Sequence, residues 1–138
     1  MRVVAATNII VSGLLWRGLP RRVLDAARDD IIELFTSVVL LDELEDVLSR
    51  EKFAKRLEGT NVTAHELVMG YAALATVIEV EPIEPVILAD TDDDAVIACA
   101  LAGQCEVITS GDSHLLDLKQ HQSIRILTAA ELLAELTL

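Results

Sequence analysis

The residues best suited to chemistry in this chain are aspartates at the two ends of one αβ unit. Asp92, Asp93 and Asp94 open an apolar helix, and Asp112 follows Gly111 just past the next strand. In an open α/β sheet the carboxyl ends of the strands border the ligand crevice, so we expect Asp94 and Asp112 to face one another across a cleft. Mg²⁺ and similar hard cations prefer oxygen ligands and keep several waters beside one or two carboxylates. The pattern therefore favours a metal site.

A purely structural explanation also exists for these acids. An aspartate at a helix start accepts backbone N–H groups and suits the positive end of the helix dipole. Asp112 can likewise serve as a turn residue or as the cap of the helix predicted through Leu116. One aspartate is enough for a cap, whereas three adjacent ones repel each other unless water, a cation or a basic partner offsets their charge. Metal binding is therefore the favoured explanation.

Another acidic candidate, Glu43, lies on an amphipathic helix predicted over residues 38–50. A solvated face explains three of the four acids on this helix, Asp42, Glu45 and Asp46. Glu43 differs because it adjoins the apolar stripe, one position before Leu44. Its spacing is equally compatible with a side chain in the sheet's crevice and one in solvent.

The hydrophobic pattern predicts alternating strands and helices along the chain. Strands are predicted over residues 2–6, 32–37 and 124–127 and over a segment that ends at 110–112. Helices are predicted from a cap at Asn8 through residue 15, from Pro20 through residue 27, and over residues 38–50, 51–57, 64–77 and 129–136, as well as in the αβ unit. Residues 80–88 contain Pro82 and Pro85 and are expected to be a connection with a short extended piece. This alternation favours a parallel sheet with helices on both faces.

Two of these helices begin with a capping-box pattern. Thr63 precedes Glu66 by three residues, and Thr128 precedes Glu131 in the same way. On the first of these helices the large side chains are expected to pack inward rather than to bind a cofactor, namely Met69, Tyr71, Leu74 and Val77.

Composition limits the class of protein. A chain of 138 residues is the size of one domain, and with 52% hydrophobic and 3% aromatic residues its core must be aliphatic. Scarce aromatics argue against folds that stack bases on aromatic platforms, and a net charge of −12 argues against binding polyanions with the whole surface. The basic residues nevertheless cluster, so a local basic rim and a solvated helix face are both open explanations for Arg17, Arg21, Arg22, Arg50, Lys52, Lys55 and Arg56.

The cysteines, histidines and apolar runs carry weaker signals. Cys99 and Cys105 make no disulfide framework and suggest a reducing cytoplasm, with Cys99 on a buried helix face. No apolar run is long enough to span a membrane. His114 is close to Asp112 in the sequence, and two interpretations of it are open. It contacts a metal or phosphate, or it is a surface histidine, which is the commoner case.

Four segments, in this order along the chain, resemble the PIN-domain family, of the sort that forms the toxin half of VapBC-type toxin–antitoxin pairs. The segments are residues 3–8, residue 37 with 41–44, residues 92–94 with 97–100, and residues 109–112 with 115–116. The resemblance implies a single PIN-like domain over residues 1–138, a three-layer α/β/α sandwich with a mostly parallel sheet. It also implies that clustered carboxylates hold Mg²⁺ or Mn²⁺ and cleave single-stranded RNA, with a cognate antitoxin protein as partner. A homodimer is expected as well, since an acidic protein needs pooled basic rims to hold RNA.

The resemblance also assigns roles by position. Glu43, Asp94 and Asp112 would be the catalytic and metal-binding acids, with Asp93 as a neighbour that assists. The metal would lower the pKa of a bound water and neutralise the charge of the transition state. Polar side chains that would orient ligands or water are Thr7, Asn8 and Ser110.

One position departs from the family pattern. The family carries an aspartate at the end of the first strand, and this chain has Ala6 there. Losing a residue that merely supports a metal ligand costs about 10- to 100-fold, so losing a ligand should cost no less. We therefore expect an impaired or inactive nuclease, either naturally degenerate or deliberately disabled, and the toxicity of an active one favours the second origin.

Two other functions compete with the nuclease. One is a non-catalytic PIN-like module that binds RNA or a partner protein. The other is a receiver-like phosphoacceptor domain, which is disfavoured because the second strand ends in Thr36 and Ser37 and the late Lys119 lies outside a strand end.

Overall fold

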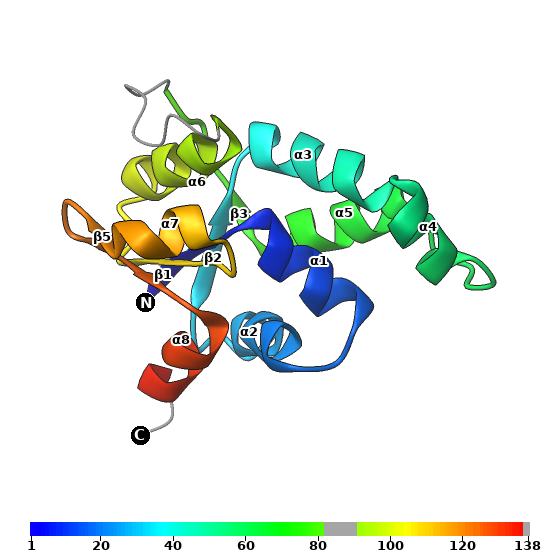
Figure 1. The fold of residues 1–138 in the computed structure, drawn as a ribbon, viewed down its shortest axis with the longest axis horizontal. Coiled ribbons are helices and arrows are strands. Elements are labelled where there is room, and N and C mark those ends of the chain that lie inside the picture. Colours follow the sequence, from blue (N-terminus) through cyan, green and yellow to red (C-terminus); the bar gives the residue numbers. More distant parts are fainter. Residues whose placement is uncertain (82–90, 137–138) are drawn as a thin grey trace.

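A mostly parallel sheet forms the middle layer of the molecule (Figure 1). The structure is a computed structural model that describes residues 1–81 and 91–136. Within this part the six-stranded sheet has the order β3-β2-β1-β4-β6-β5. The parallel strands are β1 (Arg2–Ala5), β2 (Glu33–Thr36), β3 (Thr76–Val77), β4 (Val107–Thr109) and β6 (Ile124–Leu127), while the edge strand β5 (Gln120–His121) runs antiparallel to β6.

Helices cover both faces of this sheet, so the expected three-layer α/β/α sandwich is confirmed. One core contains Val3 and Ala5 with residues of α1 (Thr7–Leu15), α2 (Leu19–Arg28), α5 (Ala64–Leu74) and α8 (Ala129–Leu136). The other core contains Val4 and Ala6 with residues of α6 (Thr91–Ala102) and α7 (Ser113–Leu118). Successive side chains of a strand point to opposite faces, and a sheet covered on both sides buries both sets.

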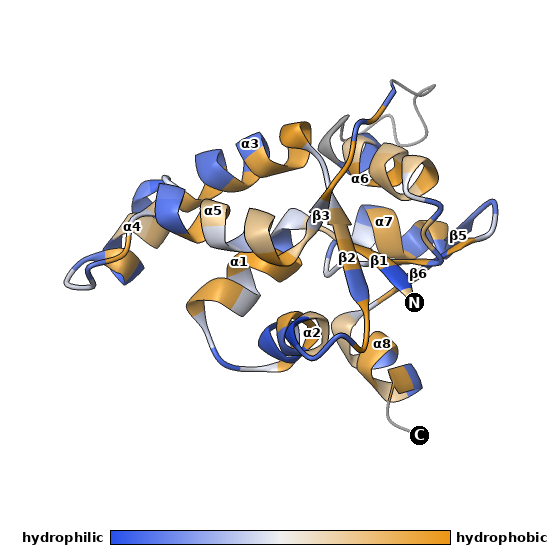
Figure 2. Ribbon diagram, turned by 180° about the vertical axis from the view of Figure 1, so that it is seen from behind, coloured by the Kyte–Doolittle hydropathy of each residue, from blue (hydrophilic) through white to orange (hydrophobic). Residues whose placement is uncertain are grey.

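Three helices project from one side of the sheet, α3 (Val38–Leu48), α4 (Glu51–Leu57) and α5 (Figures 1 and 2). The apolar stripe of α3 turns inward, with Leu40, Leu44 and Leu48 buried. None of the residues of α4 is buried. Arg56 nevertheless ties this helix to the end of α1, because its Nε and Nη2 atoms donate to the Leu15 carbonyl at 3.1 and 2.9 Å.

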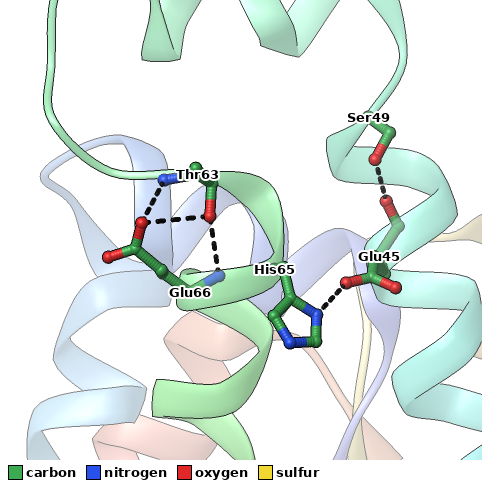
Figure 3. Close-up of polar contacts among 5 residues, drawn as sticks. All are labelled: Glu45, Ser49, Thr63, His65 and Glu66. Carbon is green, nitrogen blue, oxygen red and sulfur yellow. Dashed lines mark hydrogen bonds and ion pairs between the residues drawn. The ribbon is translucent and has the colours of Figure 1, made fainter.

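Both predicted capping boxes are present. The Thr63 hydroxyl accepts from the Glu66 N–H at 3.1 Å, and the Glu66 carboxylate accepts from the Thr63 N–H at 3.3 Å (Figure 3). Thr128 and Glu131 make the corresponding pair of bonds.

Glu45 lies beside this cap. Its side chain was expected to be solvated, but it is only partly exposed. It pairs with His65 Nδ1 at 2.6 Å and so links α3 to α5 (Figure 3).

Local patterns misjudged the ends of two helices. Asn8 was expected to cap α1, but the helix begins at Thr7, and Ala6 occupies the cap position without a side-chain bond. The helix expected over residues 64–77 ends at Leu74, because Thr76 and Val77 pair with β2.

The inward packing expected on that helix is also corrected. Tyr71 is buried and Leu74 is half-buried, but Met69 and Val77 are exposed. The connection predicted over residues 80–88 lies outside the described residues from 82 onward.

Both cysteines are buried and free, which leads to a prediction about thiol reactivity. Burial raises the pKa of Cys99 to about 12 and that of Cys105 to about 11. Because the thiolate is the reactive form, we expect the folded chain to resist iodoacetamide at pH 8 and to add two groups once unfolded in urea, as measured by intact-mass spectrometry. Rapid labelling of the folded chain would contradict this packing.

Candidate metal centre

The candidate site lies where β1 and β4 leave the sheet side by side. The two strands pair in parallel with Ala5 opposite Thr109, and the Ala6 N–H donates to the Thr109 carbonyl at 2.9 Å. The carboxyl ends of parallel strands meet at one edge, so the segment after β1 and the segment after β4 are neighbours there. Residues 6–8 and 110–112 therefore share one edge of the sheet.

Hydrogen bonds hold the loop after β4 in place. The Ser110 hydroxyl accepts from the Asp112 N–H at 2.9 Å, and the Ser110 N–H donates to the Leu127 carbonyl at 3.0 Å. Asn8 contributes from α1, because its Oδ1 accepts from the Gly111 N–H at 3.1 Å. Asn8 thus joins the two segments instead of capping its own helix, and Asp112 sits on a constrained backbone.

Three potential ligands gather at this loop. Among the described residues, Asp93, Asp112 and His114 offer ligand atoms that all lie within 4.8 Å of one another. Asp93, in the first turn of α6, is only 7% exposed, whereas Asp112 is half-buried and His114 is exposed. Two carboxylates and an imidazole are a donor set that a divalent cation accepts, so the residues fit a metal centre.

Asp112 also serves as a helix cap, which is the structural role that the sequence allowed for it. Its Oδ1 accepts from the His114 N–H at 2.7 Å and caps α7. The His114 Nδ1 atom lies 3.6 Å from the same oxygen. One carboxylate oxygen can cap the helix while the other remains available to a ligand, so capping and metal binding are compatible at this residue.

Two further acids predicted from the sequence, Glu43 and Asp94, are not among the three residues of this group. Glu43 is half-buried and lines a cleft of about 490 Å³ together with Thr7, Asn8 and Asp112. Asp94 is half-buried on α6, and the close group contains its neighbour Asp93 in its place. The roles of all four acids as metal ligands, Glu43, Asp93, Asp94 and Asp112, stay predictions.

Ala6 is buried at the same edge, only 3% exposed. Its methyl group belongs to the core formed with Leu40, Val96 and Leu115. The side chain that follows β1 is thus apolar at the edge shared with the Asp112 loop, and it can supply no oxygen to a cation.

Basic and aromatic side chains also line the cleft, and the sequence only partly indicated them. Arg50 and Lys52, from the second basic cluster, line the cleft with the acids. Trp16 and Phe53 line it too, although no motif singled them out. Their rarity in so aliphatic a chain was the signal that could have drawn attention to them.

No helix in the described part of the chain has the length and apolarity needed to cross a membrane.

One of three comparisons with known proteins identifies a family for this chain. A family model described as PIN domain matches residues 2–114, which include β1, β2, β4 and the Asp93, Asp112 and His114 group. Searches of curated proteins and of solved structures gave no match. Because the family match covers most of the sequence and both sides of the acidic edge, this chain belongs to the PIN-domain family.

Proposed function

We propose that this chain is a metal-dependent endoribonuclease of PIN type that acts on single-stranded RNA and is impaired by the alanine at position 6. The observation that carries the proposal is the convergence of Asp93, Asp112 and His114 within 4.8 Å at the carboxyl edge of the sheet. Asp93 comes from α6, whereas Asp112 and His114 come from the start of α7, and the fold that brings these two segments together is that of a family with nuclease-type function.

In this proposal each residue has a distinct task. Asp93 and Asp112 would hold the cation, with Glu43 and Asp94 as further carboxylates. Arg50 and Lys52, which line the same cleft, would attract the phosphates of the substrate. Asn8 and Ser110 keep Asp112 in place through the backbone bonds that they make to its loop. A bound divalent cation supplies an activated water and neutralises charge as the phosphodiester is cleaved.

The cation in this proposal is Mg²⁺ or Mn²⁺. Carboxylates suit both ions, but an imidazole is a better ligand for transition metals than for Mg²⁺. The presence of His114 in the group therefore favours Mn²⁺.

Calorimetric titration with Mn²⁺ tests the proposal directly. We expect Ala6→Asp to bind Mn²⁺ at least about tenfold more tightly than the unaltered chain, since it adds one carboxylate to the centre. Asp112→Asn in the Ala6→Asp background should abolish the gain. Asp42→Asn, which removes the same charge from an exposed position on α3, should preserve it. Equal affinities of Ala6→Asp and the unaltered chain would contradict the assigned centre.

A non-catalytic module that binds RNA or a partner protein is the second candidate. Ala6 favours it, because the position beside the acidic group lacks an oxygen while the cations Arg50 and Lys52 remain in the cleft. RNA binding without any cleavage by Ala6→Asp would select this function.

The biological setting completes the proposal. We propose that the protein is the toxin of a toxin–antitoxin pair, acts in the cytoplasm and is held by a cognate antitoxin protein. With a net charge of −12, one copy presents few cations to RNA, so a homodimer that pools its basic rims is part of the same proposal.

A further inference from the structure

The aromatic residues of the cleft are unusual for this chain. Its sequence has one Trp, one Tyr and two Phe. Phe35 and Tyr71 are buried, whereas Trp16 and Phe53 line the cleft, and Trp16 is 42% exposed. The two rings meet edge to face, with centroids 6.1 Å apart and planes at 65°. An exposed indole leaves apolar area in water that a flat ligand would remove.

Arg56 holds this aromatic pair in a defined arrangement. Its guanidinium carbon lies over the Trp16 ring, 5.7 Å from the centroid. The same guanidinium donates twice to the Leu15 carbonyl, at 3.1 and 2.9 Å, so it is anchored to the residue that precedes Trp16. The indole therefore sits at the junction of α1 and α4 with little freedom to lose when a ligand binds, which favours affinity.

Positive charge surrounds the two rings. The Lys52 ammonium lies 5.0 Å from the Phe53 ring centroid, and Arg50 lines the same cleft. Aromatic side chains beside a cationic groove are the combination that binds single-stranded nucleic acid, because bases stack on the rings while cations hold the phosphates. A neutral apolar ligand or an acidic peptide would use only part of this surface.

The aromatic pair of Trp16 and Phe53 lies about one helix length from the acidic group. Thr7, at the start of α1, is close to the acids, and Trp16 follows the last residue of α1. A helix of nine residues rises about 13 Å. A ligand that reaches both places must be extended.

We propose that Trp16 stacks against an unpaired base of single-stranded RNA and so positions the strand in the cleft, one helix length from the metal centre. This inference rests on the proposed function, because RNA is the ligand that the metal centre would act on. Trp16 is accordingly a positioning residue and a base-binding site.

Trp16 is the only tryptophan, so its own fluorescence reports binding. The probes are a nine-nucleotide oligoadenylate and an abasic oligomer with the same sugar–phosphate backbone. We expect the oligoadenylate to quench Trp16 and the abasic oligomer to leave its emission unchanged. In fluorescence anisotropy with labelled probes, Trp16→Leu should weaken oligoadenylate binding by about 5- to 100-fold, the range for loss of one stacked base. Its binding of the abasic oligomer should not change.

Matched variants separate stacking from charge and from folding. Trp16→Phe retains a ring and should retain most of the oligoadenylate affinity. Lys52→Gln should weaken both oligomers alike, whereas Lys55→Gln, which does not line this cleft, should weaken neither. Thermal melting of each variant confirms that it is folded.

The outcomes distinguish this inference from the proposed function. If Trp16→Leu binds both oligomers as well as the unaltered chain does, stacking is wrong, and cleavage by Ala6→Asp still tests the nuclease. If neither oligomer binds, stacking is also wrong, and absent cleavage by Ala6→Asp then removes the nuclease as well.

Discussion

Ala6→Asp is expected to cleave single-stranded RNA in the presence of Mn²⁺ at least about 100-fold faster than the unaltered chain. The pairing of Ala5 with Thr109 brings position 6 next to the loop of Ser110 and Asp112. A carboxylate there adds the oxygen donor that the methyl group cannot provide. The measurement is the rate of product formation from an end-labelled RNA, with and without a chelator.

Two variants control this result. Ala6→Asn has nearly the same shape as Ala6→Asp but no charge, and it should remain inactive. Asp112→Asn in the Ala6→Asp background should lose the restored activity. A folded Ala6→Asp protein that binds Mn²⁺ and cleaves no RNA would contradict the catalytic proposal.

The same substitution acts on stability in two opposing ways. Ala6 is the N-cap of α1 and makes no side-chain bond, so an aspartate could contribute about 1 kcal/mol as a cap. The position is buried at the same sheet edge as Asp112, however, and a second negative charge there disfavours ionisation until a cation binds. Mn²⁺ should therefore raise the melting temperature of Ala6→Asp more than that of the unaltered chain.

The second large effect concerns Gly13, a glycine inside α1 where that helix packs against α2. A Cβ at Gly13 would lie 2.8 Å from Leu24 Cδ1 and 2.9 Å from the Pro20 carbonyl oxygen. Arg21 further fixes this contact, because its Nε donates to the Gly13 carbonyl at 3.0 Å. Backbone cannot move aside as a flexible side chain can, so Gly13→Ala should lower the free energy of unfolding by about 1–3 kcal/mol in urea denaturation.

Gly70 provides the matched control for this prediction. It also lies inside a helix, α5, but a Cβ there would meet nothing within 4 Å. Gly70→Ala should raise the free energy of unfolding by about 0.4–1 kcal/mol, because alanine restricts the unfolded chain and favours the helix. A rise in the free energy of unfolding for both variants would show that the α1–α2 contact is looser than described. Since α1 carries Asn8 and ends before Trp16, that contact also supports the candidate site.

Sequence patterns that span only a few residues were enough to predict much of the fold. The capping boxes at Thr63 and Thr128 and the inward stripe of α3 follow from local hydrogen bonding and from the helical period. The short β-branched runs of β1 and β4 were enough to predict a strand in each place. The mostly parallel sheet followed from the alternation of these elements.

Contacts between distant segments settled what these patterns left open. Thr76 and Val77 continue the apolar pattern of a helix, yet pairing with β2 draws them into the sheet. Asn8 has the chemistry of a cap, yet its partner is Gly111, on a loop that packing brings alongside. In both cases a backbone segment distant in sequence supplied the hydrogen-bond partner, and the local pattern contains no information about that segment.

The residue types of the acidic centre could be read from the chain, as could the missing oxygen at position 6. Which member of the adjacent aspartates meets Asp112 could not, because each step along a helix turns the side chain by about 100° and the packing of α6 sets the starting direction. The same holds for His114 and for the cleft-lining residues Trp16, Phe53, Arg50 and Lys52, which the docking of α4 against α1 brings together. The local sequence determines the helices and strands and the types of ligand residue. The close approach of side chains that are remote in the sequence depends on how those helices and strands pack.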